Sequence, residues 1–222
     1  MIFEQRSDLK GKHAFLSPSK SSWMNYDDDK LIATYKNSMA TDIGTILHGY
    51  AADRIIHRAK MNKYEKQDVR LELLRHKIPD QLINVELYYD NLVAYVNDAI
   101  GFGLTPEVIL YYSDYAFGTT DSIRFDEKNK FLRIHDYKSG YSKVHMEQLE
   151  AYAALFVLQY GKKMGFTIND ISMELRIYQS PEVVVLNSDD TSIDLRKIIF
   201  EIMNLYIHNS IVLEDFGGVK RR

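Results

Sequence analysis

Acidic side chains and one lysine, placed where predicted strands end, are the residues of this chain best suited to chemistry. Asp136 and Lys138 close an apolar run, and side chains two residues apart in a strand project from the same face. The spacing therefore predicts both charges on the buried face that also carries Leu132 and Ile134. Burying them costs on the order of several kcal/mol unless something compensates. A divalent cation together with a phosphate would compensate, which indicates a metal-dependent phosphodiesterase.

A second acid, Asp121, lies on the preceding predicted strand among alternating apolar residues such as Ile123. The polar turn Asp126–Asn129 joins the two strands, so we expect them to pair and to bring Asp121 beside Asp136. Two such carboxylates suit Mg²⁺, which takes one or two protein carboxylates together with water and phosphate oxygens. For either acid considered alone, the alternative is a buried ion pair with a nearby cation, namely Lys138, Arg124 or Arg133.

The composition limits the classes of protein that fit. The chain has 222 residues, of which 45% are hydrophobic and 27% charged, and this suits one domain over residues 1–222. The absence of cysteine excludes disulfides, Cys-ligated zinc and an iron–sulfur cluster. With a net charge of −3, nucleic-acid binding must depend on a local basic surface or on bound metals. The 16 tyrosines suit packed strands, and some of them could be platforms for stacked bases.

No segment of the sequence predicts a membrane protein. The N-terminal residues show no cationic stretch followed by an apolar run, so we expect no secretory signal. The longest apolar run, near residues 151–158, is far shorter than the roughly 20 residues that span a bilayer. We therefore expect a cytoplasmic protein.

Hydrophobic periodicity divides the chain into a helical part at about residues 17–100 and a sheet core at about 105–210. The predicted helices cover residues 17–23, 42–60, 66–77, 81–100, 144–160 and about 191–209. The predicted strands cover residues 107–112, 115–126, 130–138, 171–179 and 183–186. This pattern is typical of an α/β (α+β) domain with helices packed on a sheet.

Local signals set the expected boundaries of these elements. Thr41 or Asp42 is the expected cap of the second helix, Gly101–Gly103 ends the fourth, and Gly161 ends the fifth. The run Asp27–Asp29 is expected to be a solvated loop. The remaining signals are a turn at Ser180–Pro181, a capping box formed by Thr191 and Asp194, and a frayed basic tail at residues 217–222.

Four short motifs, taken in order, resemble those of a known family. They are Gly44–His48, Gly118–Asp121, Asp136–Gly140 and Gln148–Tyr152, and Ser17–Ser19 precedes them. They look like the motifs of RecB-like nucleases in the PD-(D/E)xK superfamily, which includes phage lambda-type exonucleases and CRISPR-associated adaptation nucleases. The resemblance spans about residues 16–160. It implies a restriction-endonuclease-like core, with a central mixed sheet of about five strands flanked by helices.

The resemblance also implies roles for individual residues. His48, Asp121 and Asp136 would be metal ligands, together with the backbone carbonyl of Tyr137. Lys138 would orient or deprotonate the attacking water. The helix residues Gln148 and Tyr152 would steady Lys138 or the phosphate, although a polar helix edge would place them equally well. His48 alone would be an ordinary histidine, and Glu107 is either an extra ligand or a surface glutamate.

The resulting functional prediction is a Mg²⁺- or Mn²⁺-dependent deoxyribonuclease that uses one or two ions. We expect an exonuclease that resects DNA ends in phage or mobile-element recombination or repair, in the host cytoplasm if it is phage-encoded. No GxxxxGK[ST] motif is present, so a helicase motor, like a recombinase or annealing protein, would come from another chain. Oligomers are compatible with this prediction. The alternatives are a catalytically silent nuclease-fold binding or partner subunit, and an RNA-directed enzyme.

Overall fold

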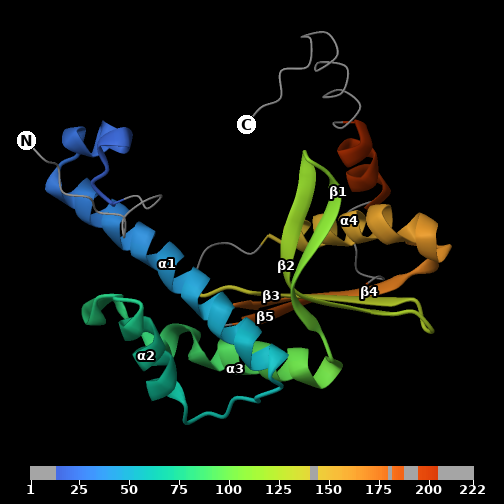
Figure 1. Cartoon of the computed structure of the whole chain (residues 1–222), viewed down its shortest axis with the longest axis horizontal. Coiled ribbons are helices and arrows are strands. Elements are labelled where there is room, and N and C mark those ends of the chain that lie inside the picture. The colour runs from blue at the N-terminus through green and yellow to red at the C-terminus, as the bar shows by residue number, and fades with distance from the viewer. Residues whose placement is uncertain (1–13, 141–144, 180–181, 188–194, 205–222) are drawn as a thin grey trace, which may run out of the picture.

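The helices and strands follow the predicted order, with helices first and a sheet after them (Figure 1). The computed structural model of the chain describes residues 14–140, 145–179, 182–187 and 195–204. The helices are α1 (Asp28–Ile56), α2 (Lys66–Arg75), α3 (Val85–Phe102), α4 (Glu147–Met164) and residues 195–204, with 3₁₀ turns η2 (Pro18–Asn25), η3 (Asp80–Leu82) and η4 (Ile168–Asp170). The strands are β1 (Thr105–Ser113), β2 (Ala116–Asp126), β3 (Phe131–Tyr137), β4 (Ser172–Gln179) and β5 (Glu182–Asn187).

The five strands form one mixed sheet in the order β1-β2-β3-β4-β5. Among them, β3 and β4 pair in parallel and the other neighbours pair antiparallel. A parallel pair needs a long crossover connection, and α4 provides it. The predicted α+β class, with a mixed sheet of five strands flanked by helices, is therefore confirmed.

Helices cover both faces of the sheet, with α3 on one side and α4 on the other (Figure 1). Strand β3 is consequently buried on both faces. Tyr137 packs into the core made by α1, α2 and α3, whereas Leu132 and Ile134 pack into the core under α4. Asp136 lies two residues after Ile134, on the same face of the strand, and is only 2% exposed. The expectation that Asp136 lies on the buried face of Leu132 and Ile134 is confirmed.

Strand β2 extends beyond its pairing with β3. The β2–β3 ladder ends at the pair Ser122–His135, whereas β2 stays paired with β1 as far as Ala116. The part of β2 that precedes Ser122 therefore leaves the sheet together with β1, as a twisted hairpin (Figure 1). Asp121 and Asp136 are the first residues past the last β2–β3 pair, at the point where the strands separate.

The predicted boundaries near the start of α1 are wrong. One helix runs from Asp28 through the positions expected to cap a shorter helix, and Asp27–Asp29 is its beginning rather than a loop. The Asp27 side chain accepts a 2.8 Å hydrogen bond from the Lys30 amide, so Asp27 is the cap. The acids of the first turn also interact favourably with the helix dipole. With this earlier cap, Thr41 and Asp42 lie inside the helix.

The predicted end of α4 at Gly161 is also wrong, because the helix continues to Met164 and ends at Gly165 with φ of 72°. A Cβ at Gly161 would lie 2.7 Å from the carbonyl oxygen of Phe166, so this glycine permits a close approach rather than stopping the helix. The predicted fourth helix is divided into η3 and α3, and its expected end at Gly103 is confirmed.

Three predicted features lie outside the described residues: the turn at 180–181, the capping box at 191 and 194, and the tail at 217–222. The strand that follows the turn is present as β5. Within the described part of the chain, no helix has both the length and the apolar character required to cross a bilayer.

Candidate metal centre

A pocket of about 650 Å³ lies where the middle of α1 passes over the separating ends of β2 and β3. We call it the acidic pocket. The predicted site side chains that line it are His48, Glu107, Asp121, Asp136, Lys138, Gln148 and Tyr152. They come from five elements or their ends, so the fold brings together residues that the sequence separates by more than 100 positions. The acidic pocket therefore contains every side chain that the sequence predicted for the site.

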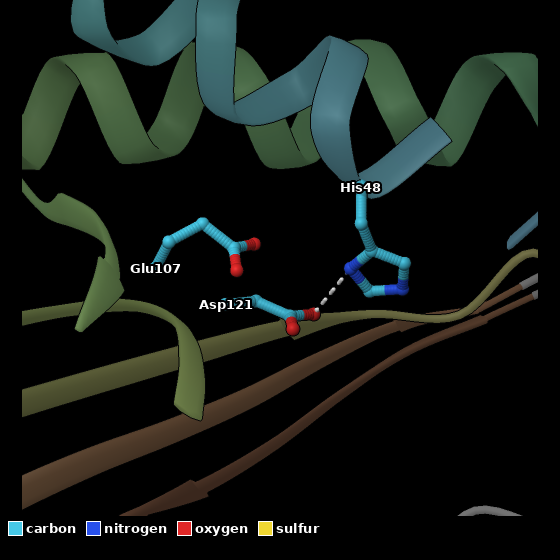
Figure 2. Close-up of side chains that lie close together, drawn as sticks. All are labelled: His48, Glu107 and Asp121. Atoms are coloured by element: carbon cyan, nitrogen blue, oxygen red, sulfur yellow. Dashed lines mark ion pairs between the residues drawn. The ribbon is translucent and has the colours of Figure 1, made fainter. Parts of the chain in front are cut away.

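Three potential ligands converge on one point of this pocket (Figure 2). One ligand atom from each of His48, Glu107 and Asp121 lies within 4.8 Å of the other two. The closest pair is His48 Nδ1 and Asp121 Oδ2, which are 3.1 Å apart. An imidazole nitrogen with two carboxylates is a donor set that divalent cations accept.

The backbone of Glu107 is strained, and the strain lies beside the other candidate ligands. Its φ of 54° is in the left-handed region, which is energetically unfavourable for a residue with a side chain such as glutamate. In the β1–β2 register, Glu107 falls opposite Asp121, because the pairs on either side are Pro106–Ser122 and Val108–Thr120. Such strain is concentrated at functional sites. Glu107 lines the pocket and is exposed, so its role as an extra ligand stays a prediction.

Asp136 and Lys138 form a close ion pair at the floor of the pocket. Lys138 Nζ donates to Asp136 Oδ1 at 3.1 Å and lies 2.9 Å from Oδ2. Oδ2 is buried and accepts no hydrogen bond from the described residues. Of the ion pairs considered for the acids, only this one forms: Arg133 pairs with Glu174, and Arg124 donates to a carbonyl of α3. Asp136 Oδ2 therefore interacts with the Lys138 ammonium by charge alone and keeps the capacity to accept a hydrogen bond or to ligate a cation.

The acids of the pocket repel one another. Burial and the charge of Asp121 raise the pKa of Asp136 to about 6, although Lys138 and His48 oppose the rise. Burial and Asp121 likewise raise the pKa of Glu107. Burial alone would lower the pKa of His48, but its hydrogen bond to Asp121 and the charges of Asp121 and Asp136 give a net rise. Burial is the largest cause of the rise at Asp136 and Glu107, and the charge of Asp121 contributes to all three shifts.

Residues of α4 hold Lys138 in place. Lys138 Nζ donates to Gln148 Oε1 at 3.2 Å, and Gln148 Nε2 donates to the Tyr152 hydroxyl at 3.4 Å. The two α4 residues are one helical turn apart, as predicted. A Cβ at Gly118 would lie 2.8 Å from the Tyr152 ring, so the absence of a side chain on β2 makes room for this tyrosine. The contact expected between Lys138 and Gln148 is therefore present.

The Tyr137 backbone also faces the pocket. Its amide donates a 2.8 Å hydrogen bond to Asp121 Oδ2. In an extended strand, the N–H and C=O of one residue project toward the same neighbouring strand, so the Tyr137 carbonyl is also directed toward β2. The Tyr137 ring is buried on the other face, where it stacks on Tyr95. The predicted carbonyl ligand is on the correct side of the strand, and its coordination of a metal stays a prediction.

Sequence reasoning gave no role to four residues of the pocket wall, which are Thr41, Thr45, Gly49 and Thr119. Thr41, Thr45 and His48 follow helical spacing on α1, and Gly44 lies beside them. A Cβ at Gly44 would lie 3.3 Å from Ser139 Oγ, so the missing side chain allows α1 to pass close to the end of β3. Thr45 and Thr119 lie inside motifs that the sequence analysis describes, whereas Thr41 could be found only by continuing the helix across position 42.

The residues present fit a hard divalent cation such as Mg²⁺ or Mn²⁺. Carboxylate oxygens are the preferred ligands of these ions, and a cation would relieve the repulsion that raises the pKa values of Asp136 and Glu107. No protein-family model, curated protein or solved structure matches this chain. A proposal for its function therefore depends on the geometry of its own residues.

Proposed function

We propose that the protein is a Mg²⁺- or Mn²⁺-dependent deoxyribonuclease of the PD-(D/E)xK type. The observation that carries this proposal is the convergence of two acids, an imidazole and a lysine on one pocket. Asp121 and Asp136 lie at the separating ends of neighbouring strands, with His48 above them and Lys138 beside them. The motifs that resemble RecB-like nucleases contain the same four residues in the same order.

The proposed roles follow from the positions of the side chains. Bound metal ions would polarise the scissile phosphate and lower the pKa of a coordinated water. His48, Asp121 and Asp136 would hold the ions, with Glu107 and the Tyr137 carbonyl as further ligands. Lys138 points its ammonium into the pocket, where it can donate to a phosphate oxygen or orient the attacking water. Gln148 and Tyr152 fix the position of that ammonium.

We further propose an exonuclease that acts in the cytoplasm on DNA ends during recombination or repair. The acidic pocket is the only part of the described structure that this proposal assigns to catalysis. A motor, recombinase or annealing protein would be supplied by another chain. If the acidic pocket binds no metal, the fold would instead serve as a silent binding subunit.

The decisive experiment is cleavage of linear and covalently closed DNA with Mg²⁺ or Mn²⁺. We expect the wild type to degrade linear DNA, EDTA to abolish the activity, and closed circles to survive. Asp136→Asn should lower the rate at least about a thousandfold, because it removes a ligand from the reacting centre. The matched control is Asp53→Asn, which alters an exposed carboxylate of α1 and should leave the rate unchanged. An unimpaired Asp136→Asn protein would contradict the proposal.

A further inference from the structure

A second hollow lies between η2 and the N-terminal half of α1, apart from the acidic pocket. It has a volume of about 400 Å³. Three aromatic side chains line it, and three polar side chains face it from α1. We call it the aromatic pocket; its rings are Phe15, Trp23 and Tyr26, and its polar residues are Thr34, Ser38 and Asp42. This combination of flat rings and hydrogen-bonding groups is typical of a site for a planar polar ligand.

The rings of the aromatic pocket are fixed before any ligand arrives. The Trp23 indole N–H donates to the Ser17 carbonyl at 3.1 Å, which orients the indole plane. Phe15 packs edge-to-face against Tyr35, with ring centroids 5.2 Å apart. The three rings belong to a short 3₁₀ turn and its flanks, which contribute little to the main cores. Rings that are already ordered lose less conformational entropy when a ligand stacks on them.

The polar side of the aromatic pocket is one stripe of α1. Thr34, Ser38 and Asp42 are four residues apart, so they lie on the same face of the helix. The Thr34 hydroxyl donates to the Lys30 carbonyl at 2.7 Å, which leaves its oxygen able to accept. Asp42 is exposed and offers two further acceptors. The stripe can therefore bind N–H groups on the edge of a ring that lies between the aromatic walls.

A cation stands at the rim of this pocket. Lys30 is exposed, and its Nζ lies 4.4 Å from the centroid of the Tyr26 ring. An exposed lysine held on the face of a half-buried aromatic ring can contact a phosphate while a base stacks nearby. The aromatic pocket therefore combines stacking surfaces, acceptors for a base edge and a positive charge.

The aromatic pocket and the acidic pocket are neighbours on α1. Asp42 lines the first and Thr41 lines the second. From Asp42 to His48 the helix rises about 9 Å, at roughly 1.5 Å per residue. In Figure 1, η2 lies beside the N-terminal end of α1, beyond the sheet. A strand whose phosphate occupies the acidic pocket can therefore extend along α1 to the aromatic rings.

We propose that the aromatic pocket binds an unpaired nucleobase of the substrate strand. This inference rests on the proposed nuclease function and adds the substrate class, which is single-stranded DNA or the unpaired end of a duplex. Bases inside a duplex are stacked on each other and cannot enter between protein rings. The aromatic pocket holds the strand while the acidic pocket cuts it.

Trp23 is the only tryptophan of the chain, so its fluorescence reports directly on this pocket. The test is a titration of the full chain in EDTA, which prevents cleavage, with a short single-stranded oligothymidylate. We expect saturable quenching of Trp23 by the single strand. A blunt hairpin duplex and free thymidine monophosphate should quench only at much higher concentrations, because the first offers no unpaired base and the second lacks the rest of the strand.

Variants separate stacking from general effects on folding. Tyr26→Ala should weaken oligonucleotide binding by about fivefold to 100-fold, as expected for the loss of one base–aromatic contact. Tyr26→Phe keeps the ring and should bind as the wild type does. The matched control is Tyr64→Ala, since Tyr64 is 79% exposed, carries Lys63 over its ring at 5.1 Å and lines neither pocket. Circular dichroism of each variant verifies its fold.

Several results would overturn the inference. These are an absence of quenching, equal quenching by the blunt duplex, equal affinity for free thymidine monophosphate, or equal losses in the Tyr26→Ala and Tyr64→Ala proteins. If Tyr26→Ala does not fold, Asp42→Ala tests the polar stripe in its place, and unchanged binding would overturn the proposal. Quenching without metal-dependent cleavage would reject the proposed nuclease and keep the binding site. Cleavage without quenching would reject the binding site and keep the proposed nuclease.

Discussion

The two faces of strand β3 carry similar sets of charged residues, but the charges are compensated by partners on one face and not on the other. On the α4 face, Asp136 belongs to the acidic pocket. On the α3 face, the adjacent residue His135 belongs to a partly buried network with Glu174, Arg176 and Asp98. Each set contains a histidine, at least two carboxylates and a cation. The comparison shows how the surroundings of similar groups decide whether their charges are compensated.

The network on the α3 face is balanced. Glu174 contacts Arg133, His135 and Arg176 at 3.1–3.4 Å. Burial alone would raise the pKa of Glu174, but these partners hold that pKa below its usual value. Burial and the charge of Arg176 lower the pKa of His135 to about 4, so the imidazole is neutral at physiological pH. Here the carboxylates have enough partners, and the network joins α3 to the sheet.

The acidic pocket lacks this balance. Its carboxylates face one lysine, and the pKa of Asp136 rises to about 6 where that of Glu174 falls. Charge that is left uncompensated in the folded protein costs stability, and natural proteins accept such a cost mainly at functional sites. The difference between the two faces therefore favours the acidic pocket, and not the His135 network, as the candidate cation site.

The largest expected contrast is in activity. Asp121→Asn should reduce Mg²⁺-dependent cleavage of linear DNA at least about a thousandfold, since that aspartate contacts His48 and belongs to the converging ligands. Asp98→Asn makes the same chemical change in the other cluster and should alter the rate less than about threefold. Initial rates of nucleotide release, with folding checked by circular dichroism, measure the contrast. Equal losses in the two variants would remove the distinction between the faces.

The next expected effect is on stability. Glu174→Ala should lower the free energy of unfolding by about 2–4 kcal/mol, because two arginines lose their shared carboxylate in a partly buried setting. Glu127→Ala, in the exposed turn after β2, should change it by less than about 0.5 kcal/mol. Urea denaturation of both variants provides the comparison. A Glu174→Ala protein as stable as the wild type would show that the network contributes little.

A third prediction is a gain in stability, in contrast to the loss expected for Glu174→Ala. Without metal at pH 7, Asp136→Asn should raise the free energy of unfolding by about 1–2 kcal/mol, because it removes a charge that burial and Asp121 disfavour. The pKa of Asp136 is higher in the folded state than its usual 3.8. The penalty is therefore complete above about pH 6 and declines as the pH falls toward 3.8. The advantage of the variant in thermal melts should decline in the same interval, and added Mn²⁺ should stabilise only the wild type.

The smallest expected effect is the pH dependence of metal binding. Protons compete with the cation for Asp136, whose pKa is about 6, and for His48, whose pKa is raised. The affinity for Mn²⁺ should fall at least about tenfold for each pH unit below 6. Calorimetric titrations between pH 5 and 8 measure this, at about 1.4 kcal/mol per tenfold change. An affinity independent of pH would mean that neither group is a ligand.

Much of the fold and of the site could be predicted from the sequence because both depend on short-range patterns. Alternation placed Asp136 on the face of Leu132 and Ile134, and the turn at Asp126–Asn129 set the β2–β3 pairing that brings Asp121 near it. Residues of α4 one turn apart were expected to share a face, and Gln148 and Tyr152 do. The metal-binding roles of these residues stay predictions.

The rest depended on long-range packing that no local pattern records. The start of α1 was missed because the cap at Asp27 was interpreted as part of a loop of acids. The His135 network was missed because its members lie on β3, β4 and α3, and their charges balance only in the folded chain. The left-handed backbone of Glu107 likewise occurs within the β1–β2 pairing, and a glutamate in the sequence does not predict such a conformation.

The separation of β2 from β3 beyond Ser122 has a consequence for how such a site can change. Where the ladder stops, the Tyr137 amide has no main-chain acceptor on β2 and uses the carboxylate of Asp121 instead. The sheet thus forks, and the candidate site residues lie where its two branches separate. One additional residue pair in the β2–β3 ladder would close this opening, whereas a hairpin leaning farther outward would admit a bulkier ligand, with no candidate site residue replaced.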